Sequence, residues 1–292
     1  MSNFKLYTDS TADLAQEIVE LIDVTVVPTE FFVRGQRYLD YPDEREMSKK
    51  DFFSAVRDGE MPITAVIPPN RFYEYFESDA KAGIPVLYIV FSTGLTTTFQ
   101  NATIAVNELR DIYPETTDIR IVDSLSASLG EGALVYYAGM MRKEGKSRDE
   151  IADWVEANRL CAHVWFTVDD LTHLRRGGRI SATAAAVGGV LHIKPLLTMD
   201  VEGHLFPAEK VRGRKSAIET IIKKVKQFSV TPENQVVFVA HADCLDDANW
   251  MRDCLLNDVG VKEVFIAQIG PVIGSHAGPG CLGCLFMGNP RA

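Results

Sequence analysis

A run of six apolar residues, VLYIVF at positions 86–91, constrains the fold of this chain more than any other segment. The run has no alternation of apolar and polar side chains, which is typical of a strand covered on both faces. A hydroxyl-rich turn follows it, and a helix is then predicted from Phe99 to Ile112. The same order of strand and helix recurs at 4–22 and at 119–144. Residues 1–158 are therefore predicted to form an α/β domain with a parallel sheet and helices on both faces.

The second half of the chain has a less regular pattern. Strands are predicted at 164–168, 194–199, 204–211, 236–241 and 264–269, and we take the last of these as the final strand. Because 194–199 and 204–211 resemble a hairpin, residues 159–292 are predicted to form a second α/β domain with a mixed sheet. The small apolar residues 182–190 predict a helix that packs close to another backbone or a long ligand.

Composition narrows the function classes. The chain has 292 residues and a net charge of -10, with acidic residues spread along its length, which disfavours a nucleic-acid partner. The amino-terminal residues lack an apolar signal core, and no apolar run approaches the ~20 residues of a spanning helix. We therefore expect a cytoplasmic protein with no integral membrane segment. Five cysteines, an odd number in a chain of this size, argue against a disulfide framework.

A glycine-rich stretch at 269–283, IGPVIGSHAGPGCLG, contains the first candidate site residue, His276. The apolar segment before it is predicted to be a strand, so the stretch leaves a sheet at the carboxyl end, where open α/β sheets bind ligands. Bare backbone N–H groups in such a loop are suited to an anion. The alternative is a tight structural turn in which the histidine caps a backbone carbonyl.

Hydroxyl side chains form a second candidate site in the turn at 92–98, STGLTTT. The turn lies between a buried strand and a helix amino terminus, a position that favours anion binding. Ser92 and Thr93 are the best donors there. The alternative is that these residues only cap the helix, since the glycine patterns of nucleotide-binding loops are missing. Thr64, just before Pro68 and Pro69, is by itself an ordinary turn threonine.

Several separate segments in order resemble the DegV family. They are DSTADL at 9–14, FSTGLTTTFQ at 91–100, VDSLSAS at 122–128, FTVDDLTHLRRGGRIS at 166–181, KVRGRK at 210–215 and IGPVIGSHAGPG at 269–280. The resemblance implies a two-domain α/β protein, not itself an enzyme, that buries a long-chain fatty acid between its domains and needs no other cofactor. Some relatives act as the fatty-acid-binding subunit of bacterial fatty acid kinase. They present the acyl carboxylate to that separate enzyme, and the acyl phosphate enters phospholipid synthesis.

The resemblance also assigns residues. By position, the groups that bind the fatty acid carboxylate would be Thr64, Ser92, Thr93, Gly94 and His276, and the basic residues near the site would be Arg179 and Arg212. It implies no catalytic residue and no metal ligand. A carboxylate buried without partners would be very costly, so several O–H or N–H donors and a nearby cation are the chemistry that such a site requires.

Two alternatives remain open from the sequence. The first is a hydrolase or phosphotransferase that uses His276 as general base or phosphate acceptor beside a hydroxyl-rich anion site. No nucleophile elbow or phosphate-binding loop accompanies the histidine. The second is redox or zinc chemistry at Cys281 and Cys284, which form a lone C-x-x-C without a second pair.

Overall fold

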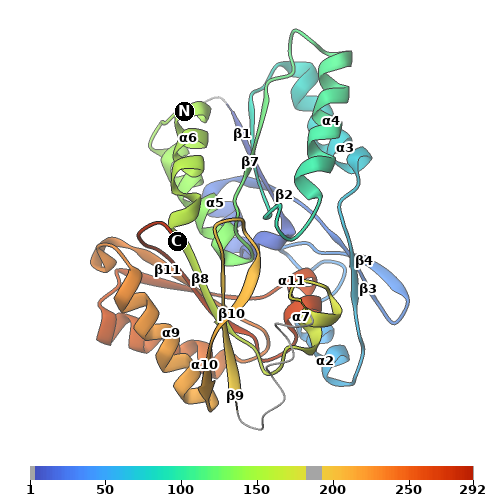
Figure 1. The fold of residues 1–292 in the computed structure, drawn as a ribbon. Coiled ribbons are helices and arrows are strands. Elements are labelled where there is room, and N and C mark those ends of the chain that lie inside the picture. The colour runs from blue at the N-terminus through green and yellow to red at the C-terminus, as the bar shows by residue number, and fades with distance from the viewer. Residues whose placement is uncertain (1–3, 182–192, 292) are drawn as a thin grey trace.

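The computed structural model describes residues 4–181 and 193–291, and its sheets lie in two separate regions of the molecule (Figure 1). The amino-terminal half forms sheet A, with strands β1 (Lys5–Asp9), β2 (Val24–Val27), β6 (Val86–Val90) and β7 (Ile119–Asp123). The strand order is β2-β1-β6-β7, and every pair is parallel. All five residues of β6 are buried, because helices cover both faces of the sheet. The predicted parallel α/β half is confirmed.

Besides α2 (Lys49–Arg57), five helices belong to this half. They are α1 (Gln16–Ile22), α3 (Pro69–Ala82), α4 (Thr98–Ile112), α5 (Leu129–Lys143) and α6 (Arg148–Asn158). Helices α3 and α4 pack against each other, while α1 and α6 both pack against α5. Helix α5 also contacts β6 of sheet A and strands of the second sheet, so it lies between the two sheets (Figure 1). Its apolar middle is buried, which permits this position.

The carboxyl-terminal half forms sheet C, which has six strands. They are β8 (Ala162–Thr167), β9 (Ile193–Met199), β10 (Leu205–Arg212), β11 (Val236–His241), β12 (Glu263–Gln268) and β13 (Leu282–Met287). The order is β10-β9-β8-β13-β11-β12, in which only β11 and β12 pair in parallel. The predicted mixed sheet is confirmed. Helices α9 (Arg214–Phe228) and α10 (Leu245–Cys254) pack on this sheet through a separate apolar cluster.

The prediction for the glycine-rich stretch was wrong in two respects. Residues Pro271–Ala277 form a short helix, α11, with proline at its first position, where a missing N–H costs nothing. The strand at Glu263–Gln268 is not the last one, because β13 follows and inserts between β8 and β11. Glycines obscured β13 in the sequence. At Gly283 an added Cβ would lie 3.1 Å from the Cβ of Phe166 on the neighbouring strand, which explains the small residue there.

A small antiparallel sheet B was not predicted as a unit. It consists of β3 (Glu30–Val33), β4 (Gln36–Leu39) and β5 (Ile63–Ala65), in the order β4-β3-β5. Helices α2 (Lys49–Arg57) and α7 (Thr172–Arg176), together with β3 and β5, contact α11. Segments from both halves of the chain therefore surround the short helix that carries His276 (Figure 1).

The remaining elements are short. They are the 3-10 turns Ser10–Ala12 (η1), Arg159–Cys161 (η2) and Pro232–Asn234 (η3) and the π-helical turn Leu255–Val259 (η4). The helix predicted at 182–190 lies outside the described residues. Within 4–181 and 193–291, no helix has the length and apolar character required to cross a bilayer. Sheet A ends at Asp123 and sheet C begins at Ala162, so the predicted domain boundary near residue 158 falls between them and stays a prediction.

Candidate functional site

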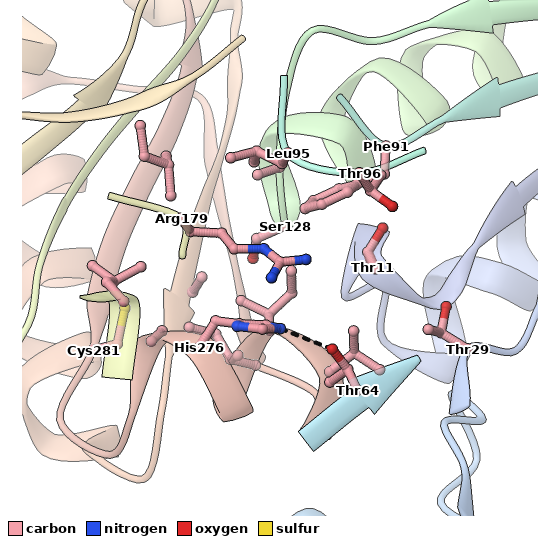
Figure 2. A pocket seen from close by; sticks show the side chains of 18 of the residues that line it. Thr11, Thr29, Thr64, Phe91, Leu95, Thr96, Ser128, Arg179, His276 and Cys281 are labelled. Carbon is pink, nitrogen blue, oxygen red and sulfur yellow. Dashed lines mark hydrogen bonds between the residues drawn. The ribbon is translucent and has the colours of Figure 1, made fainter. Parts of the chain in front are cut away.

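A cavity of about 130 Å³ lies where sheets B and C, the loops of sheet A and helix α11 meet (Figure 2). This volume is far above the ~10–15 Å³ that a single water needs, so the cavity has room for a ligand. Its apolar wall includes Phe91, Leu95, Val164, Phe166, Leu205, Ile273 and Leu285. The lining comes from both halves of the chain, as expected for a site between the two sheets.

Polar side chains gather at one part of this cavity, around Thr64 and His276. The hydroxyl Oγ1 of Thr64 lies 2.9 Å from the imidazole Nε2 of His276. The guanidinium of Arg179 points into the same space, directly beside the imidazole (Figure 2). Strand β5 supplies the threonine, helix α11 supplies the histidine, and the turn after α7 supplies the arginine. Three of the predicted site residues are thus brought together by three separate elements.

The imidazole of His276 is held in a neutral state by its surroundings. Burial, together with the positive charges of Arg179 and Arg176, lowers its pKa to about 4. Its Nδ1 is buried and has no hydrogen-bond partner in the described part of the chain. Gly177 packs against this nitrogen so closely that an added Cβ would lie 2.1 Å from it. A glycine at 177 is therefore required for the ring to lie where it does.

Arg179 supplies the positive charge of the site. The residue is half-buried, and its guanidinium donates a hydrogen bond to the carbonyl oxygen of Gly177. Burial lowers its pKa, although an arginine stays charged at physiological pH. Within residues 4–181 and 193–291, no carboxylate lies within ion-pair distance of this guanidinium. A charged group in this position is suited to an anionic ligand.

Two cavity hydroxyls that the sequence analysis did not select, Thr11 and Ser128, are backed by buried acids. The hydroxyl of Thr11 contacts carboxyl oxygens of both Asp9 and Glu131. The hydroxyl of Ser128 donates to Oδ2 of Asp13 at 2.5 Å. The segment DSTADL provides no side-chain cap for the following helix α1, and its side chains build this network instead. The many polar residues of DSTADL were a sequence signal for a polar site. The partners of Thr11 and Asp13 could not be predicted, because they lie more than 100 residues away in the chain.

The structure places Ser92, Thr93 and Gly94 outside the cavity lining. The Ser92 hydroxyl is fully buried and donates to the carbonyl oxygen of Gly203 at 2.9 Å, joining the β6 loop to the β9–β10 turn. The Thr93 hydroxyl donates to Asp123 at 2.5 Å. An added Cβ at Gly94 would lie 2.7 Å from the Gly203 backbone. In this structure Ser92 and Gly94 lie at a contact between the halves of the chain, and Thr93 bonds within the amino-terminal half. Thr96 and Thr98 of the same loop line the cavity.

Comparison with known proteins identifies the family. The family model described as "Uncharacterised protein, DegV family" matches residues 3–289, which is nearly the whole chain. The chain belongs to the DegV family. A DegV domain-containing protein of Clostridium perfringens is 42% identical over 291 residues, covering 100% of this chain and 99% of the relative.

Solved structures of other DegV-family proteins share the fold. A structure from Thermus thermophilus, described as fatty acid binding of a DegV family protein, is 31% identical with a TM-score of 0.87, covering 98% of this chain and 99% of that one. A structure from Bacillus subtilis, described as DegV, a fatty acid binding protein, is 29% identical with a TM-score of 0.86, covering 99% and 100%. The two-domain α/β architecture of this DegV-family chain is thereby established.

Arg212, the other predicted basic residue, is exposed at the end of β10 and does not line the cavity. A role for it near the site stays a prediction. The described residues contain no group of three or more His, Cys, Asp or Glu side chains arranged to hold a metal ion.

The cysteine pair of this DegV-family chain is poorly arranged for redox chemistry. Cys281 and Cys284 are both buried and unbonded, and burial raises the pKa of each thiol. They also belong to different apolar clusters of the protein, so their side chains do not face each other. A reactive dithiol requires exposure and a lowered thiol pKa, and this pair has neither.

The geometry also disfavours His276 as a general base. An imidazole with a pKa of about 4 is a weak base at neutral pH, and its Nδ1 lacks the carboxylate that orients a catalytic histidine. The arrangement is instead suited to binding, because it offers a hydroxyl, a neutral imidazole and a cation to one anionic group.

Proposed function

We propose that this protein binds a long-chain fatty acid, with the acyl chain in the apolar part of the cavity and the carboxylate beside Thr64, His276 and Arg179. The observation that carries the proposal is the convergence of these three polar groups at one part of an otherwise apolar cavity. The structures from Thermus thermophilus and Bacillus subtilis, both described as fatty acid binding, support the same ligand class.

The hydrogen-bond roles at the head group follow from the unpaired Nδ1 of His276. Buried N–H groups without a partner are rarer in proteins than under-satisfied acceptors. We therefore assign the proton to Nε2, which then donates to Oγ1 of Thr64. This leaves the hydroxyl hydrogen of Thr64 free to donate to a carboxylate oxygen, and Arg179 supplies the compensating charge.

The acyl chain supplies most of the binding free energy in this proposal. Each buried methylene contributes about 0.8 kcal/mol, so about fourteen of them contribute on the order of 10 kcal/mol before the costs of association. The head-group contacts then serve mainly to choose an acid over an alcohol or an ester, because the neutral ligands would leave Arg179 without a counter-charge.

A direct test is mass spectrometry of an organic extract of the purified protein, followed by calorimetric titration of the delipidated protein with palmitate. We expect a co-purified fatty acid and one binding site per chain. A protein that carries no fatty acid and takes none up on incubation would rule the proposal out.

We propose further that the protein is cytoplasmic and presents the bound carboxylate to a separate fatty acid kinase, which makes an acyl phosphate for phospholipid synthesis. The motifs shared with the family support this step. The test is to add ATP and a fatty acid kinase catalytic protein to the loaded protein and to measure acyl phosphate. Product should require all three components, and a kinase that phosphorylates free fatty acid equally well would contradict it.

A further inference from the structure

Four buried acidic side chains lie close to two cavity hydroxyls, those of Thr11 and Ser128. Asp9 and Glu131 are 1% and 0% exposed, and Asp13 and Asp40 are both 5% exposed. In the described part of the chain none of the four forms an ion pair, and the nearby cation, Lys49, pairs with Glu44 at 3.9 Å. Lys49 favours the ionised forms of Asp13 and Asp40, but one cation cannot compensate four buried carboxylates, so we expect the group to retain protons.

The number of hydrogens available around Thr11 is a second argument, independent of burial, that the acidic cluster retains a proton. The hydroxyl oxygen of Thr11 is within hydrogen-bond distance of Asp9 Oδ1 and of Glu131 Oε2, which lies 3.1 Å away. A hydroxyl has one hydrogen, which two acceptors can only share in a weaker, three-centre bond. A full hydrogen bond at both contacts requires a hydrogen from a carboxyl group, so this geometry favours one proton retained between Asp9 and Glu131.

The second pair of acids is joined to both the cavity and the helix of His276. Asp13 Oδ1 accepts from the backbone N–H of Gly270 at 2.8 Å, and Asp13 Oδ2 accepts from the cavity-lining hydroxyl of Ser128. A Cβ added at Gly270 would lie 3.0 Å from an oxygen of Asp13 and 3.0 Å from one of Asp40. These two carboxyl groups are thus neighbours at the start of α11 and titrate as a coupled pair.

Unsatisfied polar atoms on the adjoining cavity wall indicate that this wall faces a ligand. The hydroxyl of Thr29 is buried, lines the cavity and has no hydrogen-bond partner among the described residues. The carbonyl oxygen of the same residue accepts from the backbone N–H of Asp40. A ligand carboxylate that reaches this wall would bring its negative charge close to Thr11 and Ser128, whose hydroxyls contact Asp9, Glu131 and Asp13.

From this arrangement we infer that binding of a fatty acid anion is coupled to uptake of a proton by the cluster Asp9, Asp13, Asp40 and Glu131. The inference rests on the proposed function. The proton comes from solvent and forms a carboxyl O–H bond, and no bond of the ligand changes. Arg179 compensates one negative charge, while the neutral His276 compensates none. Other charged or titratable groups that face the cluster in the described part of the chain are Lys49, Glu44, the hydroxyl of Tyr88 and the thiol of Cys281.

The titration range of the cluster makes the uptake measurable near neutral pH. Burial is the main reason that the pKa of Asp13 is raised to about 6 and that of Asp40 to about 7. A neighbouring acid adds to each rise, and the charge of Lys49 opposes it. Asp9 and Glu131 are raised by burial too. If one proton is taken up on binding, affinity falls about tenfold for each unit of rising pH through this range.

The experiment is calorimetric titration of the delipidated protein with dodecanoate at pH 7.5 in phosphate and in Tris, whose ionisation enthalpies differ. The slope of heat against ionisation enthalpy gives the protons taken up, which we expect to be between about 0.3 and 1. Methyl dodecanoate, which fills the apolar cavity without a charge, should bind with a slope near zero.

Substitutions in the acidic cluster test which carboxyl groups take up the proton. Asp13→Asn and Asp40→Asn keep the shape of the side chain but remove its titratable proton. Each should at least halve the slope of binding heat against buffer ionisation enthalpy. The control is Asp111→Asn at an exposed position, which should leave that slope unchanged. Circular dichroism and methyl ester binding report whether the variants fold. Dodecanoate binding with no buffer dependence would overturn the inference, as would a slope that persists in both folded variants. Absence of any binding to well-folded wild type would instead contradict the proposed function.

Discussion

Thr64 and His276 are 212 positions apart in the chain, and their side chains lie 2.9 Å from each other, Oγ1 to Nε2. Thr64 lies on β5 of the small sheet B, whereas His276 lies on α11, which follows the last strand but one of sheet C. The contact exists because sheet B and α2 pack around α11. The contact leaves the hydroxyl hydrogen of Thr64 available to an anion, because the imidazole can donate its own hydrogen to the threonine oxygen.

Thr64→Val should lower affinity for palmitate by about 10- to 100-fold, since a hydrogen bond to a charged group is worth ~1.5–3 kcal/mol and valine matches the shape. Calorimetry measures the change. Thr220→Val is the matched control, because that hydroxyl only bonds the Ser216 carbonyl within α9 and should not affect binding. Equal affinity of Thr64→Val and wild type would rule out this hydroxyl as a donor to the ligand.

His276 should remain neutral down to about pH 4. Nitrogen-15 NMR of the imidazole from pH 8 to 4 should show no protonation step near 6.5, where the unfolded chain titrates. Because the folded pKa is lowered, the unfolded state gains the proton first, and His276 should reduce stability as pH falls from about 6.5 towards 4. A titration midpoint above 6 would contradict the buried neutral state.

Gly177→Ala should displace the imidazole, because the new Cβ would lie 2.1 Å from Nδ1 of His276. We expect affinity for palmitate to fall about tenfold, in line with the ~1–3 kcal/mol cost of overpacking. The effect should largely disappear when the same change is made in His276→Ala, which removes the clash. An undiminished effect in that background would mean that Gly177 acts through something other than the ring.

Ser92→Ala tests whether this hydroxyl joins the two halves or binds the ligand. Losing its bonds to the Gly203 carbonyl and the Gly94 N–H should reduce the free energy of unfolding by ~1–3 kcal/mol. Urea unfolding measures this, with the exposed Ser78→Ala as control. A loss of fatty acid affinity without a loss of stability would instead support the sequence-based role as a carboxylate donor.

Asp40→Asn should stabilise the protein at pH 8 and have little effect at pH 4.5. The pKa of Asp40 is raised to about 7 in the fold, so its contribution is favourable below the unfolded pKa and is lost as pH rises through 7. Removing the charge should recover roughly 1–3 kcal/mol at pH 8. Urea unfolding at both pH values decides this, and destabilisation at pH 8 would show that the ionised carboxylate is needed.

The strands and helices of sheet A could be predicted because each is encoded by residues close together in the chain. The unbroken apolar run at 86–91 required a strand buried on both faces, and the structure has β6 there. By contrast, β13 contains glycine and follows a glycine-proline turn, so local preference argued against a strand. Pairing with β8 and β11 on both sides overrides that preference.

The candidate site could likewise be predicted only in part from the sequence. The family motifs pointed to Thr64, Arg179 and His276, and these residues do line one cavity. The same motifs pointed to Ser92 and Thr93, whose hydroxyls are used by Gly203 and Asp123 in the structure. No sequence pattern indicated which of the many hydroxyls would find a partner inside the protein and which would stay available in the cavity.

The sequence by itself therefore determined the order and type of most elements, the α/β class and the residue types from which an anion site could be made. Only the tertiary structure decided that Thr64 meets His276, that Gly177 leaves room for the ring, and that Asp9 and Glu131 share one hydroxyl. The physical reason is the distance along the chain over which each kind of interaction acts. Helix and strand preferences act between residues a few positions apart, whereas burial, charge and hydrogen-bond pairing depend on neighbours that only the packed chain brings together.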